Sequence, residues 1–298
     1  MRRRRVILVV SACMVAGVLA AFGETFGPEP EYGGKTLSQW LVAYGGLDSK
    51  RQSDLQYHTS PTVDPDVKDM AARAVRHIGT NALPFLREWR QGDRPAWTKG
   101  MKLWGSAWME GYAILGPAAS SAIPELAELT KANPDTNYAG WNAILALRFL
   151  GEGALPPLLA VLTNRTLVDG RRGNGAISIG TMRSLGSDVN RAVPILVRCL
   201  QDNEVAEDAA LALGDLALSP ELCVPALVKA LARTDERVRW SAADALGRFG
   251  SAAKSAVPRL NRALSDRQEL VRRCAREALK RIEMDVVYAK RAHGGTGK

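Results

Sequence analysis

Residues 238–282 read VRWSAADALGRFGSAAKSAVPRLNRALSDRQELVRRCAREALKRI, and this stretch decides the fold. Val238 begins a segment in which small or apolar residues recur at helical spacing, and Gly250 ends it. Pro258 then stands where a first-turn proline opens a second helix. The pattern restarts at Val271, 33 residues after Val238. Self-similarity at a fixed period predicts a stack of helix pairs in which each repeat contacts only its neighbours.

The same pattern extends back along the chain to Val67. Its first helices are expected to begin at Val67, Trp104, Ala139, Asn174, Val205, Val238 and Val271. Twelve residues after these come Gly79, Gly116, Gly151, Gly186, Ala217, Gly250 and Glu283. The second helices are expected to open at Pro84, Pro124, Pro157, Pro194, Pro225 and Pro258, each with a leucine two residues on. We therefore predict an all-α fold, a right-handed α-α superhelix of about six and a half helix pairs.

This repeat resembles the HEAT repeat, in the short bacterial form related to the phycobilisome-lyase-type repeats. The resemblance covers roughly residues 67–283 and implies an armadillo-like helical solenoid. The preceding segment GGKTLSQWL, residues 33–41, looks like the entry segment of envelope-anchored bacterial HEAT-repeat proteins. The resemblance is specific for the fold and leaves the activity open, because such solenoids host many functions.

The N-terminus carries a basic and then an apolar segment. Arg2–Arg5 precede the uncharged run 6–22, VILVVSACMVAGVLAAF. Basic residues before such a run retain the N-terminus in the cytoplasm and send the downstream chain across the membrane. The run is long for a signal-peptide core and short for a spanning helix. We predict that residues 1–22 are an apolar helix acting as a signal peptide or membrane anchor, with the body outside the cytoplasm.

The flanks of the solenoid are predicted to be a linker and a tail. Residues 23–66 form a linker that contains an N-terminal capping helix, for which Thr36 and Gln39 have capping-box spacing. Leu37, Trp40 and Leu41 would cover the end of the solenoid. Residues 284–298 are expected to form a basic C-terminal tail.

Charge and cysteine content give little sign of a specific chemistry. The formal net charge is +9, but without Arg2–Arg5 there remain 36 basic against 31 acidic residues, or +5. Cys13, Cys199, Cys223 and Cys274 have no metal-ligand or CxxC spacing. We expect Cys199 and Cys274 to be buried, unpaired thiols.

Catalytic motifs matter because HEAT-type solenoids include enzymes. The resemblance raises deoxyhypusine hydroxylase, which holds iron through His-Glu pairs, but none of His58, His77 and His293 is followed by Glu. No nucleophile triad or phosphate-binding glycine loop with a preceding strand is found. We therefore expect a non-enzymatic protein with no catalytic, metal or cofactor-binding residues. A chromophore-handling protein of the phycobilisome-lyase type remains a less favoured alternative.

A second alternative is a nucleic-acid-binding HEAT-like protein, such as a DNA glycosylase. Tryptophans between Trp89 and Trp108 alternate with basic residues, as stacking on exposed bases would require. The competing interpretation places Trp89, Trp104 and Trp108 in apolar repeat positions, which leaves only Trp97 in a loop. An export leader also argues against DNA as the partner.

What remains is the surface, above all the second helices and the long loops 90–103 and 163–175. If the second helices line the concave face, a basic set of side chains lies on it and in the loops. The candidate partner-binding residues are Arg87, Arg90, Arg94, Trp97, Lys99, Lys102, Arg171, Arg172, Arg198, Lys229, Arg233, Arg259 and Arg262. We predict a protein-interaction scaffold of the bacterial cell envelope that binds an acidic protein segment or an anionic envelope polymer.

Overall fold

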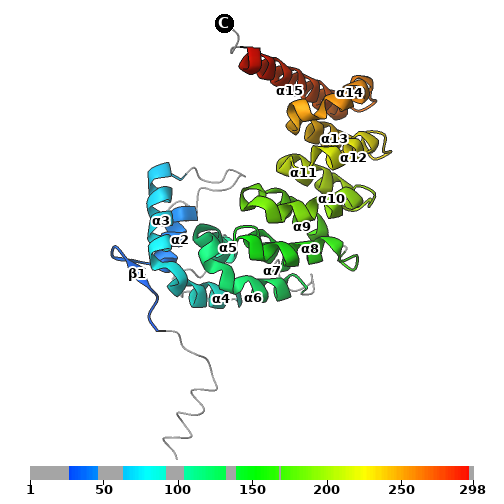
Figure 1. Ribbon diagram of the computed structural model, residues 1–298. Coiled ribbons are helices and arrows are strands. Elements are labelled where there is room, and N and C mark those ends of the chain that lie inside the picture. The colour runs from blue at the N-terminus through cyan, green and yellow to red at the C-terminus, as the bar shows by residue number, and fades with distance from the viewer. Residues whose placement is uncertain (1–26, 46–62, 92–103, 132–138, 168, 295–298) are drawn as a thin grey trace, which may run out of the picture. The chain divides into compact units, whose positions relative to one another are not determined.

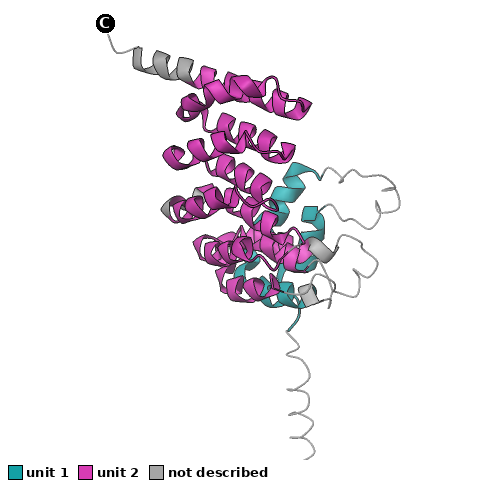
Figure 2. Ribbon diagram, turned by 90° about the vertical axis from the view of Figure 1, so that its right-hand side faces the viewer, with its two compact units in different colours: residues 1–105 teal, residues 106–298 magenta. Residues whose placement is uncertain are grey.

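The computed structural model describes residues 27–45, 63–91, 104–131, 139–167 and 169–294, which form two compact units, 1–105 and 106–298. Figure 2 distinguishes the units by colour. Among the described residues no helix is both long and apolar enough to cross a membrane. The apolar run 6–22, predicted to be a helix, lies outside the described residues.

The first unit begins with a small β-hairpin and the predicted capping helix. Strands β1 (Glu31–Tyr32) and β2 (Lys35–Thr36) pair antiparallel, a feature that the linker prediction missed. Helix α2 (Leu37–Gly45) follows, and its capping box is confirmed, since Thr36 N–H donates to Gln39 Oε1 over 3.0 Å. The side chains of Leu37, Trp40 and Leu41 are buried, as predicted.

The remaining helices of this unit are α3 (Pro65–Ile78) and α4 (Leu83–Gln91), joined by a 3₁₀ turn. Helix α2 packs against α3, and the ring of Tyr32 lies 4.2 Å from that of His77. Asp64 caps α3, because its side chain accepts the N–H of Asp66.

The second unit is a stack of helix pairs, and from residue 139 onward each first helix lies beside the next one (Figure 1). Its first helices are α5 (Trp104–Leu115), α7 (Ala139–Leu147), α9 (Arg171–Gly180), α11 (Ala206–Leu216), α13 (Glu236–Arg248) and α15 (Glu269–Gly294). The second helices are α6 (Ile123–Leu129), α8 (Leu155–Thr163), α10 (Val193–Cys199), α12 (Pro220–Ala230) and α14 (Val257–Ala263). This arrangement confirms the predicted all-α repeat architecture within this unit.

The turn predicted twelve residues into each repeat is confirmed for all but the last. The glycines at these positions have positive φ, from 55° at Gly250 to 89° at Gly151. Ala217 also adopts positive φ, 45°, although it has a side chain. The exception is Glu283, which lies inside α15, so the helix continues to Gly294 through much of the predicted tail.

Three details of the predicted register are wrong. Helix α9 begins at Arg171 and not at Asn174, because the three extra residues of this repeat lie after the helix, before Gly186. The buried leucine of α8 is Leu158, so the equivalent proline is Pro156 and not Pro157. Helix α12 opens at Pro220, which leaves Pro225 inside the helix.

First helices approach one another through glycine and alanine. Gly180, Gly214 and Gly247 occupy equivalent positions on α9, α11 and α13. A Cβ atom on Gly214 would lie 2.7 Å from the Cα atom of Ala245 on the next first helix. Because real Cβ atoms do not approach so closely, these contacts require glycine and set the distance between repeats.

Candidate functional site

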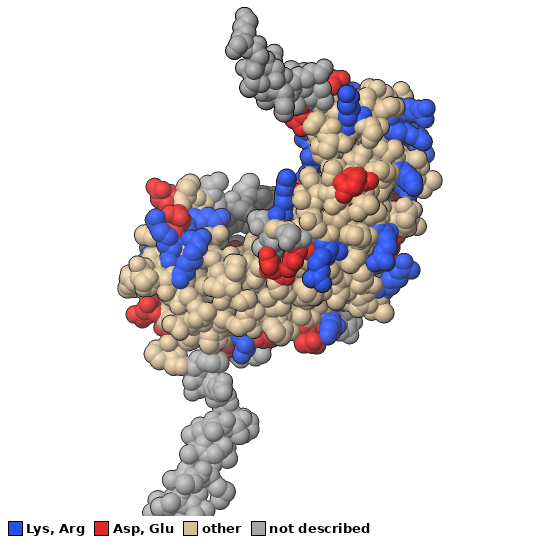
Figure 3. Space-filling model, in the orientation of Figure 1, with Lys and Arg blue, Asp and Glu red and all other residues tan. Residues whose placement is uncertain are grey.

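The second helices α10, α12 and α14 present a row of basic side chains. On each helix a leucine two residues after the proline is buried, at Leu196, Leu227 and Leu260. The side chain two residues after each of these leucines points away from the core. These exposed side chains are Arg198, Lys229 and Arg262, and with Arg259, which is exposed directly after Pro258, we call them the basic row. Figure 3 shows Lys and Arg side chains along the side of the second unit on which these helices lie.

The basic row spans the three consecutive repeats that contain α10, α12 and α14, and the repeat of α6 lacks it. Arg198, Lys229 and Arg262 each stand four residues after the proline of their helix. The equivalent residue of α6 is Glu128, which pairs with Lys131 at 2.7 Å. The basic character therefore belongs to the C-terminal repeats.

Arg233, predicted to bind a partner, donates hydrogen bonds to the protein itself. It is half-buried after the end of α12, and its guanidinium donates to the backbone oxygen of Leu200 over 3.0 Å and to the side chain of Asn203. These bonds connect it to the preceding repeat. Two of its guanidinium nitrogens are therefore occupied within the protein, and its binding to a partner stays a prediction.

Arg171 and Arg172 were predicted to lie in an exposed basic loop, and this prediction is wrong. Both lie in the first turn of α9 and each is 4% exposed. Arg171 donates to Asp169 and, over 2.7 Å, to the backbone oxygen of Thr130. The loop before α9 is shorter than the predicted 163–175, because the helix starts three residues earlier than expected.

Arg172 connects its own repeat to the next one. Its guanidinium lies 2.5 Å from Asp202 and 2.7 Å from Glu204, and its Nε donates to the backbone oxygen of Leu162 over 3.1 Å. Burial alone would raise the pKa of Asp202, but the hydrogen bond and charge of Arg172 lower it below its usual value. Both groups are therefore ionised, and the donors of Arg172 are taken up by bonds within the protein.

Of the candidates from the first unit, the structure describes the side chain of Arg87 alone. Arg87 is exposed on α4, which also contains Arg90. Arg94, Trp97, Lys99 and Lys102 lie outside the described residues. Trp89 and Trp108 are buried, which confirms the core interpretation of these two rings and removes them as stacking platforms.

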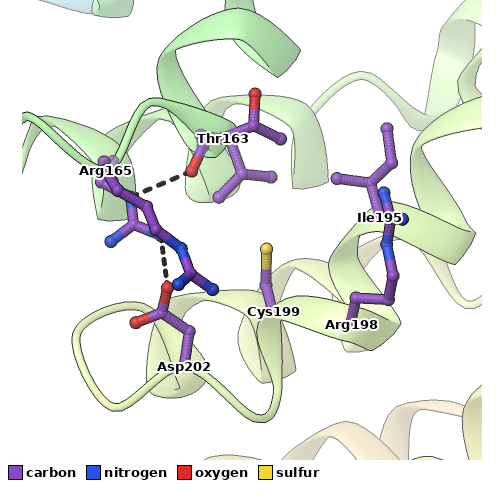
Figure 4. Close-up of a pocket in the computed structure, with 8 residues that line it drawn as sticks. Thr163, Arg165, Ile195, Arg198, Cys199 and Asp202 are labelled. Carbon is purple, nitrogen blue, oxygen red and sulfur yellow. Dashed lines mark hydrogen bonds and ion pairs between the residues drawn. The ribbon is translucent and has the colours of Figure 1, made fainter.

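A pocket of about 300 Å³ lies where the end of α8 meets α10 (Figure 4). Its lining comprises Leu162, Thr163, Arg165, Arg172, Ile195, Arg198, Cys199 and Asp202. In Figure 4 the sulfur of Cys199 lies between Arg165 on one side and Ile195 with Arg198 on the other. The sequence contains one sign of this pocket. Aspartates recur every 33 residues, at Asp169, Asp202 and Asp235, and Asp202 is part of the lining.

The thiols carry no sign of reactivity or metal binding. Cys199 and Cys223 are buried, whereas Cys274 is only half-buried, contrary to prediction. Burial raises the pKa of the Cys199 thiol and raises that of Cys223 to about 12, so both are protonated at neutral pH. Within the described residues no three His, Cys, Asp or Glu side chains gather as metal ligands.

Comparison with known proteins supports the repeat assignment. Residues 193–280, from α10 to α15, match the family model for HEAT repeats, which confirms the resemblance over this segment. No match was found among curated proteins.

The solved structures that are similar to the chain include two that cover most of it. One is an engineered protein with 24% sequence identity, covering 63% of this chain and 93% of its own, at a TM-score of 0.41. The other is human deoxyhypusine hydroxylase in complex with glycerol, with 16% identity, 83% and 96% coverage, and a TM-score of 0.36. Neither similarity bears on what this chain binds.

Proposed function

We propose that the second unit is a non-enzymatic protein-interaction scaffold that binds an acidic protein segment along α10, α12 and α14. The observation that carries this proposal is the basic row, in which Arg198, Lys229 and Arg262 stand at equivalent positions of three consecutive repeats and are all exposed. Repeated exposed charge of one sign attracts a partner of opposite sign and fixes its register.

The repeat spacing suggests how such a segment would be arranged. Packed helices lie about 8–10 Å apart, and an extended chain advances about 3.3 Å per residue. Three residues of an extended segment therefore match one repeat. A partner with an acidic side chain at every third position would meet one basic side chain of the row on each of the three helices.

The test is a binding titration with peptides of identical composition. The spaced peptide is fluorescein-labelled Glu-Ser-Gly repeated four times, and the clustered peptide has the same residues with its glutamates consecutive. Fluorescence anisotropy at about 0.15 M salt, where surface charges are screened beyond about 8 Å, is expected to show tighter binding of the spaced peptide. The double variant K229Q/R262Q is expected to weaken binding about tenfold.

The matched control is R273Q/R276Q, which removes the same charge from exposed positions on α15, outside the row. It is expected to change the affinity by about twofold at most, through the long-range field alone. Equal losses in both double variants, or no binding of either peptide, would overturn the proposal. Tighter binding of a DNA duplex than of the spaced peptide would favour the nucleic-acid alternative, and tighter binding of an anionic polysaccharide the envelope polymer.

We also propose that the body of the protein acts outside the cytoplasm, in the bacterial cell envelope. The support is the sequence of Arg2–Arg5 followed by the apolar run 6–22. Fractionation of cells that express the full-length chain, with mass analysis of the recovered N-terminus, tests this. Recovery in the membrane or exported fraction supports the proposal, and a soluble cytoplasmic chain that retains Arg2–Arg5 overturns it.

A further inference from the structure

The pocket between α8 and α10 has the size and position of a small binding site. Its volume of about 300 Å³ lies at the lower end of the range for ligand pockets. It lies between two consecutive repeats, beside the first helix of the basic row. Arg198 belongs both to the row and to the pocket lining, so a segment that follows the row reaches the pocket at α10.

The charge of the lining favours an anion. Three guanidinium groups, of Arg165, Arg172 and Arg198, face one carboxylate, that of Asp202. Arg172 is committed to Asp202, Glu204 and a backbone oxygen. Arg165 and Arg198 are exposed, and neither guanidinium donates a hydrogen bond to another residue in the described part of the chain. Their donors are available to a ligand.

The rest of the lining favours an anion on an apolar stem. Ile195 and Leu162 supply hydrocarbon surface, and the Cys199 thiol is neutral because burial raises its pKa. A dianion such as phosphate would bring two negative charges toward Asp202, whereas a carboxylate brings one. A glutamate side chain combines one negative charge with a short hydrocarbon stem.

We propose that this pocket binds a single glutamate side chain of the acidic partner segment, with the carboxylate between Arg165 and Arg198 and the stem against Ile195. The proposal rests on the proposed function and adds to it the place where the segment is anchored. Charge-assisted hydrogen bonds from two guanidinium groups to one carboxylate are stronger and more directional than the screened attraction of an exposed row.

The first measurement compares two single variants in the titration with the spaced peptide. R165Q removes a pocket guanidinium that is not part of the row, and R191Q removes an exposed arginine just before α10 that does not line the pocket. R165Q is expected to weaken binding about tenfold and R191Q by about twofold at most. T163F, which fills the pocket from an exposed position without a change of charge, is expected to weaken binding as R165Q does.

The second measurement locates the bound side chain in the wild-type protein. Alkylation by iodoacetamide, a neutral reagent, is followed at Cys199 by mass spectrometry at about pH 9, where a larger fraction of the thiol is ionised, with the half-buried Cys274 as an internal reference. The spaced peptide is expected to slow modification of Cys199 severalfold and to leave Cys274 unchanged, because the glutamate would cover the sulfur.

The outcomes separate this inference from the proposed function. If K229Q/R262Q weakens binding while R165Q matches R191Q and Cys199 is not protected, the scaffold proposal stands and the pocket proposal fails. If the wild-type protein binds no acidic peptide, both fail. If a peptide with phosphoserine in place of glutamate binds and protects Cys199 while the spaced peptide does not, the choice of a carboxylate is overturned.

Discussion

The first helices and the second helices of the repeats both carry arginines, and the two sets behave in opposite ways. Arg172 and Arg239, at the starts of α9 and α13, are 4% and 6% exposed and bind acidic side chains of the following repeat. Arg198 and Arg262, on α10 and α14, are exposed and remain available. Position within the repeat, and not residue type, decides whether an arginine joins repeats or stays exposed.

The largest effect is expected from the buried set. Arg239 makes a bidentate pair with Asp266, at 2.8 and 3.0 Å, and donates to the backbone oxygens of Arg233 and Thr234. R239M should lower the free energy of unfolding by about 3–5 kcal/mol, because it leaves a poorly hydrated carboxylate without its cation. Denaturant unfolding of the second unit within the full chain measures this loss.

The exposed counterpart is R262M, which makes the same chemical change on the second-helix side. It should alter the free energy of unfolding by less than about 0.5 kcal/mol. Acid should reduce the contrast between R239M and R262M. The pKa of Asp266 is held below its usual value, first by the hydrogen bond from Arg239, so the pair stabilises the fold above about pH 4. The difference between R239M and wild type should shrink below that pH, and equal losses for R239M and R262M would break the comparison.

A smaller effect is expected where the first helices touch. G214A should destabilise the second unit by about 1–2 kcal/mol, since overpacking of about 1–3 kcal/mol exceeds the gain in helix propensity of about 1 kcal/mol. The added Cβ would lie 2.7 Å from the Cα atom of Ala245. A thermal unfolding midpoint above that of wild type would show that the first helices can separate without loss, contrary to a contact that requires glycine.

A pH-dependent effect is expected at Asp208 in the first turn of α11. Burial, and then the charge of Glu207, raise its pKa to about 6, while Arg237 lowers it. Protonation therefore favours folding, and this contribution is present below about pH 4 and lost as the pH rises through about 6. D208N should gain about 1 kcal/mol over wild type between pH 4 and 7, a value reduced because the carboxyl is partly hydrated.

Unfolding of both proteins across that pH range measures the difference. Other carboxyl groups titrate in both proteins and cancel in the comparison. A stability difference that stays constant with pH would show that folding does not raise the pKa of Asp208.

The smallest effect on stability is expected on the second-helix side itself. K229Q/R262Q should change the free energy of unfolding by less than about 0.5 kcal/mol, because both side chains are exposed. The same double variant is expected to lose peptide affinity. A stability loss above about 1 kcal/mol would mean that the basic row supports the fold, and the distinction between the two sets of basic residues would fail.

The sequence predicted the repeat architecture because each repeat has few ways to meet its constraints. Gly79, Gly116 and Gly250 mark turns that require positive φ, and Leu196 and Leu260 mark the buried side of second helices. Replacing a glycine of positive φ or a buried leucine at such a position would destabilise the fold. The residue types found there therefore indicate the structural role of the position.

Register errors arose where a repeat changes length. The repeat of α9 was aligned on Gly186, although its three extra residues lie between the helix end and that glycine. In α12 the positive φ angles of Ala217 and Ser219 turn the chain early, so the helix opens at Pro220 and runs through Pro225. Sequence periodicity indicates that a residue is inserted but not on which side of a turn.

The candidate site was predicted only in part. Exposed residues of the row, such as Arg198 and Arg262, follow from helical spacing alone. Arg171, Arg172 and Arg233 could not be recognised as structural, because their partners Thr130, Asp202 and Leu200 belong to other helices. The pocket is lined by residues from two repeats, so the sequence of a single repeat does not predict it.

The glycine–alanine contacts have a consequence for how such a chain can change over generations. Each contact between successive first helices pairs one glycine with one alanine: Gly180 with Ala212, Gly214 with Ala245, and Gly247 with Ala278. These contacts, which we call joints, are therefore interchangeable. An in-frame duplication of the segment from α13 through α14 would present the new copy with the same joint on both sides. The number of basic side chains in a row can thus grow by whole repeats in one genetic step, without any new packing solution.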